Sequence, residues 1–167
     1  MMELKYSEVL KLNKELGNNL KSSSYDITVL SNIIVHQSKE MLEYSLRGEG
    51  INANVKFGDY DNIVQDSKKY QDSNSVIIFW ELCNIIDGLQ YKIELMNNNQ
   101  LNELLEKTKI EIDLVMKNLE KTSLVLMNKF TSLSFSYSKI RKNNLDELAS
   151  HINHYLEENL SENVRLV

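Results

Sequence analysis

Short apolar runs alternate with longer amphipathic stretches along the whole chain, and this alternation restricts the fold more than any other feature. Residues 27–30, 76–79 and 124–127 are nearly continuous apolar runs, which are typical of strands buried on both faces. Residues 51–57 alternate apolar and polar side chains, as in an edge strand, and 164–167 form a fifth short run. Strands separated by helices imply right-handed crossovers and a parallel sheet between two helix layers.

Apolar residues at helical spacing fill the stretches between the strands. We expect helices at residues 4–20, 37–47, 61–69, 82–96, 101–119 and 145–156. Gly17 is the expected end of the first helix, and Gly48 and Gly50 suit a left-handed C-terminal cap. Because the second strand has the pattern of an edge, we predict a three-layer, flavodoxin-like α/β domain at 25–167 with strand order 2-1-3-4-5. Residues 1–24 would add an N-terminal helix and loop.

Composition narrows the classes of function. A chain of 167 residues is one domain, and its net charge of −5 argues against nucleic acid as a partner. A single cysteine fits a reducing compartment, and no apolar run is long enough to cross a membrane, so we expect a cytoplasmic protein. No motif for a cofactor is found, and none is expected. The chain stops on the last residue of a strand, so we expect a fragment of a longer polypeptide, truncated after that strand.

Candidate site residues follow the strands. Ligands of open parallel sheets bind outside the carboxyl ends of the strands, where the strand order reverses. The residues that follow the strands there are Ser31, Asn32, Gly58, Glu81, Asn84, Asn128 and Lys129. The alternative is that these polar residues only end strands and cap the helices that follow.

From this point of the chain onward, the sequence resembles a known family. The segments VLSNIIVHQSKEMLEYSLRGEGINANVKFGDYDNIVQDS and VIIFWEL look like the N-terminal region of FkbH-like proteins. Those proteins carry an SGNH-hydrolase-like domain followed by a phosphatase-type domain of the haloacid dehalogenase (HAD) superfamily. The resemblance implies an SGNH-like sheet and a role in acyl transfer of the glyceryl type, or in small-molecule or polysaccharide biosynthesis. It also implies a partner, either an acyl carrier protein or a downstream HAD domain.

The catalytic pattern of SGNH hydrolases is only partly present. The resemblance makes Ser31 the candidate nucleophile, although it lies in Leu30-Ser31-Asn32-Ile33 and not in a Gly-Asp-Ser turn. Gly58 matches the oxyanion-hole glycine by position. The family also has a Gly-x-Asn-Asp motif after the third strand, and of this motif the chain keeps only Asn84, in Glu81-Leu82-Cys83-Asn84. The Asp-x-x-His motif that supplies the base would follow the fifth strand, where the chain ends. A serine nucleophile needs a neighbouring base, and none can be assigned.

Three hypotheses follow from this pattern. The first is a non-catalytic accessory domain of an FkbH-like protein that docks a carrier or serves a HAD domain. The alternative is an esterase or acyltransferase that uses Ser31 with a histidine base outside this fragment. The third is a flavodoxin-like module that binds a small ligand.

The remaining polar groups give weaker signals. If an acidic carrier binds, Lys129 and Arg141 are the basic residues expected to meet it. His151 and His154, flanked by Glu147 and Glu158, have the spacing of a helix-built metal site, but a solvated helix face is the favoured interpretation. Cys83 lies in an apolar stretch and is expected to be inert.

Overall fold

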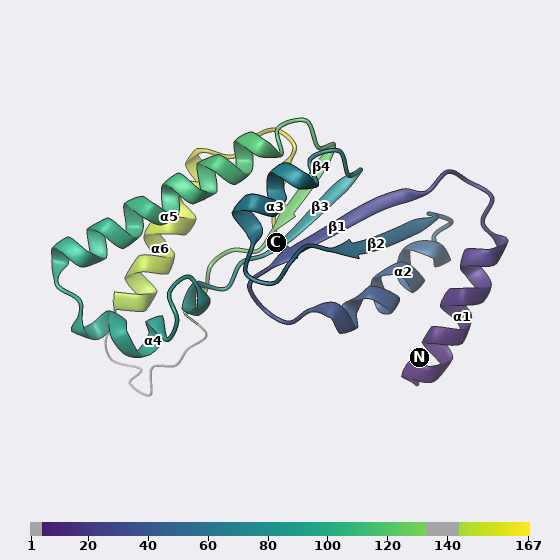
Figure 1. The fold of residues 1–167 in the computed structure, drawn as a ribbon, viewed down its shortest axis with the longest axis horizontal. Coiled ribbons are helices and arrows are strands. Elements are labelled where there is room, and N and C mark those ends of the chain that lie inside the picture. The colour runs from purple at the N-terminus through teal and green to yellow at the C-terminus, as the bar shows by residue number, and fades with distance from the viewer. Residues whose placement is uncertain (1–4, 133–143) are drawn as a thin grey trace.

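The computed structural model describes residues 5–132 and 144–167 and contains a five-stranded sheet (Figure 1). Every neighbouring pair of strands is parallel, and the order β2-β1-β3-β4-β5 confirms the predicted topology. The strands are β1 (Tyr25–Ser31), β2 (Ala53–Phe57), β3 (Ser75–Phe79), β4 (Leu124–Met127) and β5 (Val164–Leu166).

Helices lie on both sides of the sheet, as the predicted three layers require. On one side are α1 (Tyr6–Asn19) and α2 (Lys39–Gly48), and on the other are α3 (Ile63–Lys69), α5 (Asn98–Asn118) and α6 (Asn144–Glu158) (Figure 1). The short elements are η1 (His36–Ser38), η2 (Leu82–Asn84), α4 (Leu89–Lys92) and η3 (Ile93–Leu95). None of the helices in the described part of the chain is long and apolar enough to cross a membrane.

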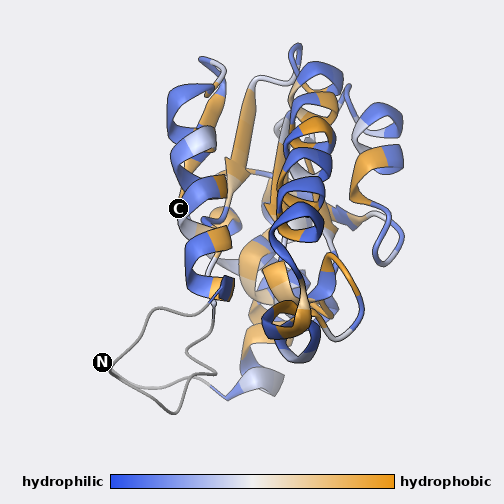
Figure 2. Ribbon diagram, turned by 90° about the vertical axis from the view of Figure 1, so that its left-hand side faces the viewer, coloured by the Kyte–Doolittle hydropathy of each residue, from blue (hydrophilic) through white to orange (hydrophobic). Residues whose placement is uncertain are grey.

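The sheet separates two apolar cores of different size. The larger core lies under α3, α5 and α6, and it completely buries Val76, Ile78, Val125 and Met127. The smaller core lies under α2 and is built on Ile27, Val29, Ala53 and Val55. In Figure 2 the strands are mainly apolar, and the helices carry both apolar and polar bands.

Two local predictions were wrong. Residues 82–96 form three short helical pieces instead of one helix, because Gly88 adopts a left-handed conformation (φ +68°) that interrupts the helical backbone. Gly17 does not end α1, which continues to Asn19. It lies against α2, where a Cβ atom would come within 3.1 Å of Arg47 Nη1, so the missing side chain permits close packing of the two helices.

Side chains of α2 cover the free edge of the sheet at β2. The buried Glu43 accepts a hydrogen bond from the backbone N–H of Val55 (3.0 Å), and Arg47 donates to the carbonyl of Ala53 (2.8 Å). Glu43 and Arg47 also pair with each other at 3.3 Å, and Asn13 of α1 bonds to both. An uncovered edge strand invites pairing with another chain, so this network both closes the edge and fixes α1 on α2.

The opposite face of β1 and β2 is polar where helices leave it uncovered. Asp26 and Lys56 form an ion pair of 2.9 Å, and their side chains are 38% and 52% exposed. Asn54 and Ser24 also donate hydrogen bonds to Asp26. The bonds from Lys56, Asn54 and Ser24 lower the pKa of Asp26 from its usual 3.8 to about 2.

This lowered pKa predicts a small loss of stability in acid. A carboxyl whose folded pKa is depressed stabilises the fold above its unfolded pKa, and this contribution disappears as the pH falls from about 4 towards about 2. Asp26→Asn should flatten that part of the curve of unfolding free energy against pH, by less than about 1 kcal/mol because the pair is exposed. Urea unfolding at several pH values measures it, with Glu15→Gln as the control that should follow the wild type. A curve for Asp26→Asn that parallels the wild type throughout would contradict this reasoning.

Candidate functional site

The carboxyl ends of β1 and β3 are joined by the side chain of Asn32, which is 1% exposed. Its Oδ1 accepts from the Glu81 N–H at 2.7 Å, and its Nδ2 donates to the Glu81 carbonyl at 2.9 Å. The Asn32 backbone N–H donates to Phe79, and its carbonyl accepts from Asn84 Nδ2. The amide thus extends the pairing of β1 and β3 beyond the strands, and its hydrogen-bonding groups are occupied by the protein itself.

The side chain of Asn128 joins the carboxyl ends of β3 and β4 in the same way. Its Oδ1 accepts from the Trp80 N–H at 2.7 Å, and its Nδ2 donates to the Trp80 carbonyl at 3.1 Å. Asn153 of α6 makes the same pair of bonds to the N–H and carbonyl of Phe130, each at 2.8 Å. We call Asn32, Asn128 and Asn153 the amide braces. Asn32 and Asn128 were predicted as binding residues, and the geometry gives both a structural use.

Ser31 lies at the predicted end of β1 but is not arranged as a nucleophile. It is 8% exposed, and its Oγ donates to the carbonyl of Ile33 at 2.8 Å. No His, Asp or Glu side chain is hydrogen-bonded to Ser31 among the residues that the structure describes. The nearby His36 instead stacks on Phe57, with ring centroids 4.5 Å apart. A serine without a base keeps its proton and attacks esters poorly.

Gly58 has a packing role at the position where an oxyanion-hole donor was expected. Its backbone N–H donates to the Val29 carbonyl at 2.9 Å, as part of the pairing of β1 and β2. A Cβ atom at this position would lie 2.5 Å from Asp66 Oδ2 and 2.7 Å from Leu30 Cδ2. Glycine is therefore required for the close approach of the buried Asp66, and its N–H is not available to a substrate.

The other predicted binding residues are also engaged. Glu81 accepts a hydrogen bond from the Cys83 N–H at 3.4 Å, which caps η2. The Cys83 thiol is buried, and burial together with the charge of Glu81 raises its pKa to about 11, which disfavours the reactive thiolate. Lys129 pairs with Glu157 at 2.6 Å, with both side chains about half exposed. Arg141 lies outside the described residues.

A pair of aspartates beside this edge was not among the predicted site residues. Asp59 and Asp61 follow β2 with the Asp-x-Asp spacing of the HAD nucleophile motif, and that spacing was the signal that could have identified them. Asp59 is 76% exposed and lies 3.9 Å from Lys69. Asp61 has a positive φ of 55°, and its N–H donates to the Ser31 carbonyl. Both follow the edge strand β2, and the bond from Asp61 to Ser31 brings Asp61 to the carboxyl end of β1.

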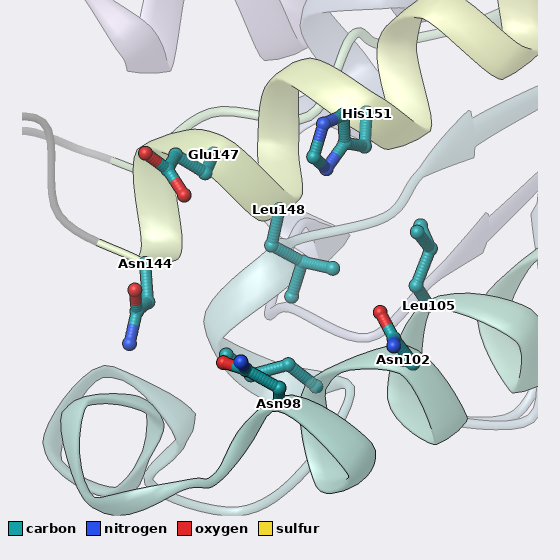
Figure 3. Close-up of a pocket in the computed structure, with 8 residues that line it drawn as sticks. Asn98, Asn102, Leu105, Asn144, Glu147, Leu148 and His151 are labelled. Atoms are coloured by element: carbon teal, nitrogen blue, oxygen red, sulfur yellow. The ribbon is translucent and has the colours of Figure 1, made fainter.

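The structure also contains cavities that the sequence did not indicate. One of about 300 Å³ lies between the first turns of α5 and α6, with a base of leucines and a rim of asparagines, Glu147 and His151 (Figure 3). Another, of about 190 Å³, lies beside Trp80 and Asp61 at the carboxyl edge.

The histidines of α6 do not form a metal site with the residues that the structure describes. His154 Nε2 lies 3.3 Å from Glu158 Oε1. Across residues 5–132 and 144–167, no three His, Cys, Asp or Glu side chains gather closely enough to hold a metal ion.

Comparison with known proteins shows the fold and little more. No protein-family model matches the chain, and no curated protein matches its sequence. Its structure resembles the N-terminal part of a Bacteroides fragilis protein that contains a phosphatase domain and was solved in complex with Mg, with a TM-score of 0.66 and 13% identity. The match covers 98% of this chain but only 45% of that one. At this identity the likeness shows the shared fold, and it gives no support to SGNH activity.

Proposed function

We propose that this chain is a non-catalytic α/β domain that works beside a phosphatase-type domain of the HAD superfamily. The observation that carries the proposal is the arrangement of the carboxyl edge. The Ser31 hydroxyl, the Gly58 N–H and the amides of Asn32 and Asn128 all bond to the protein backbone. Groups used in this way hold loops in place and leave no nucleophile, base or oxyanion donor for an ester substrate.

The likeness to part of a phosphatase-containing protein supports the choice of neighbour. This chain spans 45% of the solved chain that it matches, so any substrate of a whole protein of this kind is part of what we propose. Within it, the FkbH-like resemblance suggests acyl transfer of the glyceryl type to an acyl carrier protein. A carrier that approached Lys129 would have to compete with Glu157 for the same ammonium group. This favours the phosphatase-type domain over the carrier as the direct partner.

The proposal predicts that the chain has no hydrolase activity of its own. We expect no hydrolysis of p-nitrophenyl acetate above the background rate of buffer alone, and none of p-nitrophenyl phosphate with Mg²⁺. This holds for the wild type and for the variants Ser31→Ala and Asp59→Asn. Among the described residues, no base is bonded to Ser31, and Asp59 lies just after the edge strand β2, beside Lys69 and without the cluster of groups that phosphoryl transfer needs.

Release of p-nitrophenol, followed by absorbance, measures both activities, with a known esterase and a known phosphatase as positive controls. If the wild type turns over acetate and Ser31→Ala does not, the esterase alternative is correct. The same result with phosphate and Asp59→Asn would make this chain itself a phosphatase. Either outcome ends the accessory-domain proposal.

A further inference from the structure

On the side of α2, the surface of β3 and β4 is apolar, and none of the helices among residues 5–132 and 144–167 lies over it. On the side of α2, the half-buried side chains of β3 and β4 are Ile77, Phe79, Leu124 and Leu126, which we call the open face. On the opposite side of the same strands, Val76, Ile78, Val125 and Met127 are 0% exposed. Residues 124–127 were predicted to be buried on both faces, and the structure buries only one.

Another part of the same sheet is exposed to solvent and can be compared with the open face. On the side of α3, the surface of β1 and β2 that helices leave uncovered carries Asp26, Asn54 and Lys56. Alternation of apolar and polar residues marks a strand with one solvated face, and β2 has this pattern. β4 has four apolar residues in succession and does not. The residues of the open face are therefore apolar, as is typical of a sheet surface that another element packs against.

The dimensions of the open face suit one helix. Neighbouring strands are about 4.8 Å apart, so the width from β3 to β5 is about 10 Å, close to the diameter of a helix with its side chains. Leu42 and Leu46 of α2 already pack on β1 and β2. A helix beside α2 would therefore continue the same helix layer from β1 and β2 over β3 and β4.

A cation marks the outer border of the open face. Arg165 of β5 is in register with Leu126 and therefore lies on the same face of the sheet. It is exposed, and its Nη1 donates to the carbonyls of Glu162 and Val164. A guanidinium at the rim of an apolar surface favours a partner with carboxylates at the matching position.

We propose that the open face docks a single amphipathic helix of a partner domain, apolar along one stripe and acidic along the border that meets Arg165. This inference rests on the proposed function, because an accessory domain needs a surface for its partner. It deepens that function by naming the surface and the chemistry of what binds there.

Two synthetic helical peptides test the proposal on the full chain. Both have leucines at i, i+3, i+4 and i+7 and are labelled with a fluorophore. One carries three glutamates along one border of the stripe, and the other carries lysines at the same positions. We expect the acidic peptide to bind the wild type at least tenfold more tightly than the basic one, measured by fluorescence anisotropy. Arg165→Glu should reverse this order of affinities.

Matched variants locate the binding. Leu126→Asp should abolish binding of both peptides, whereas Ile110→Asp on the exposed face of α5, where Ile110 is 66% exposed, should leave it unchanged. Circular dichroism of each variant confirms that it is folded. Equal affinities for the two peptides, no binding of either, or equal loss in both variants would overturn the proposal. So would a wild-type dimer in sedimentation that Leu126→Asp converts to monomer, since the occupant would then be a second copy. None of these outcomes depends on the hydrolase assays, so the two proposals can fail separately.

Discussion

Replacing Glu43 by alanine should lower the free energy of unfolding by about 3–5 kcal/mol, the range for removing one partner of a buried ion pair. The substitution leaves the Arg47 guanidinium without its carboxylate. It also leaves the Val55 N–H, on the free edge of β2, without an acceptor. Guanidinium unfolding followed by circular dichroism measures the loss. Glu15→Ala is the matched control, because Glu15 forms an exposed pair with Lys11 at 3.9 Å and should cost about 0.5 kcal/mol or less.

Self-association is a second measurement, which separates the loss of the ion pair from the exposure of the sheet edge. If Glu43 protects the edge of the sheet, Glu43→Ala should also self-associate at concentrations where the wild type is unchanged. Glu43→Gln, which keeps an oxygen for the Val55 N–H, should lose stability but self-associate less. A Glu43→Ala variant as stable as Glu15→Ala would show that α2 does not close this edge.

Replacing Asn32 by leucine should cost about 2–4 kcal/mol of unfolding free energy. Leucine has a similar size but leaves the N–H and the carbonyl of Glu81 unpaired, and each unpaired buried group costs about 1–3 kcal/mol. Chemical unfolding measures this loss as well. Asn84→Ala is the control, since Asn84 is exposed and donates a single bond, and it should cost less than about 1 kcal/mol. A stable Asn32→Leu variant would return Asn32 to the list of candidate ligand-binding residues.

Much of the fold could be predicted because its strands are short and strongly apolar. The runs at 27–30, 76–79 and 124–127 lie within or match β1, β3 and β4, and the alternation at 51–57 marked β2 as an edge. Helical periodicity failed at 82–96, where the left-handed backbone of Gly88 interrupts an otherwise suitable apolar stripe. Periodicity also could not show that Leu124 and Leu126 stay half-buried, with none of the described helices over them, because an apolar residue looks the same in a sequence whether or not a helix covers it.

The positions of the candidate site residues could be predicted from the sequence, but their hydrogen-bond partners could not. Sequence position put Ser31, Asn32 and Asn128 at the carboxyl ends of the strands, and the structure places them there. The sequence could not show which groups the asparagine side chains bond to. An amide that binds a ligand and an amide that pairs with the backbone after the neighbouring strand are the same residue in a sequence. Only the three-dimensional partners, Glu81 for Asn32 and Trp80 for Asn128, distinguish the two uses.

The amide braces have a consequence for the lifetime of the native state. They join residues that lie 49, 48 and 23 positions apart in the sequence. Such contacts form only after the intervening segments have been brought together, since closing long loops costs entropy before the contact stabilises anything. Interactions that are absent from the transition state slow unfolding without speeding folding. We therefore expect the three amide braces to form late in folding and to slow unfolding more than they speed folding.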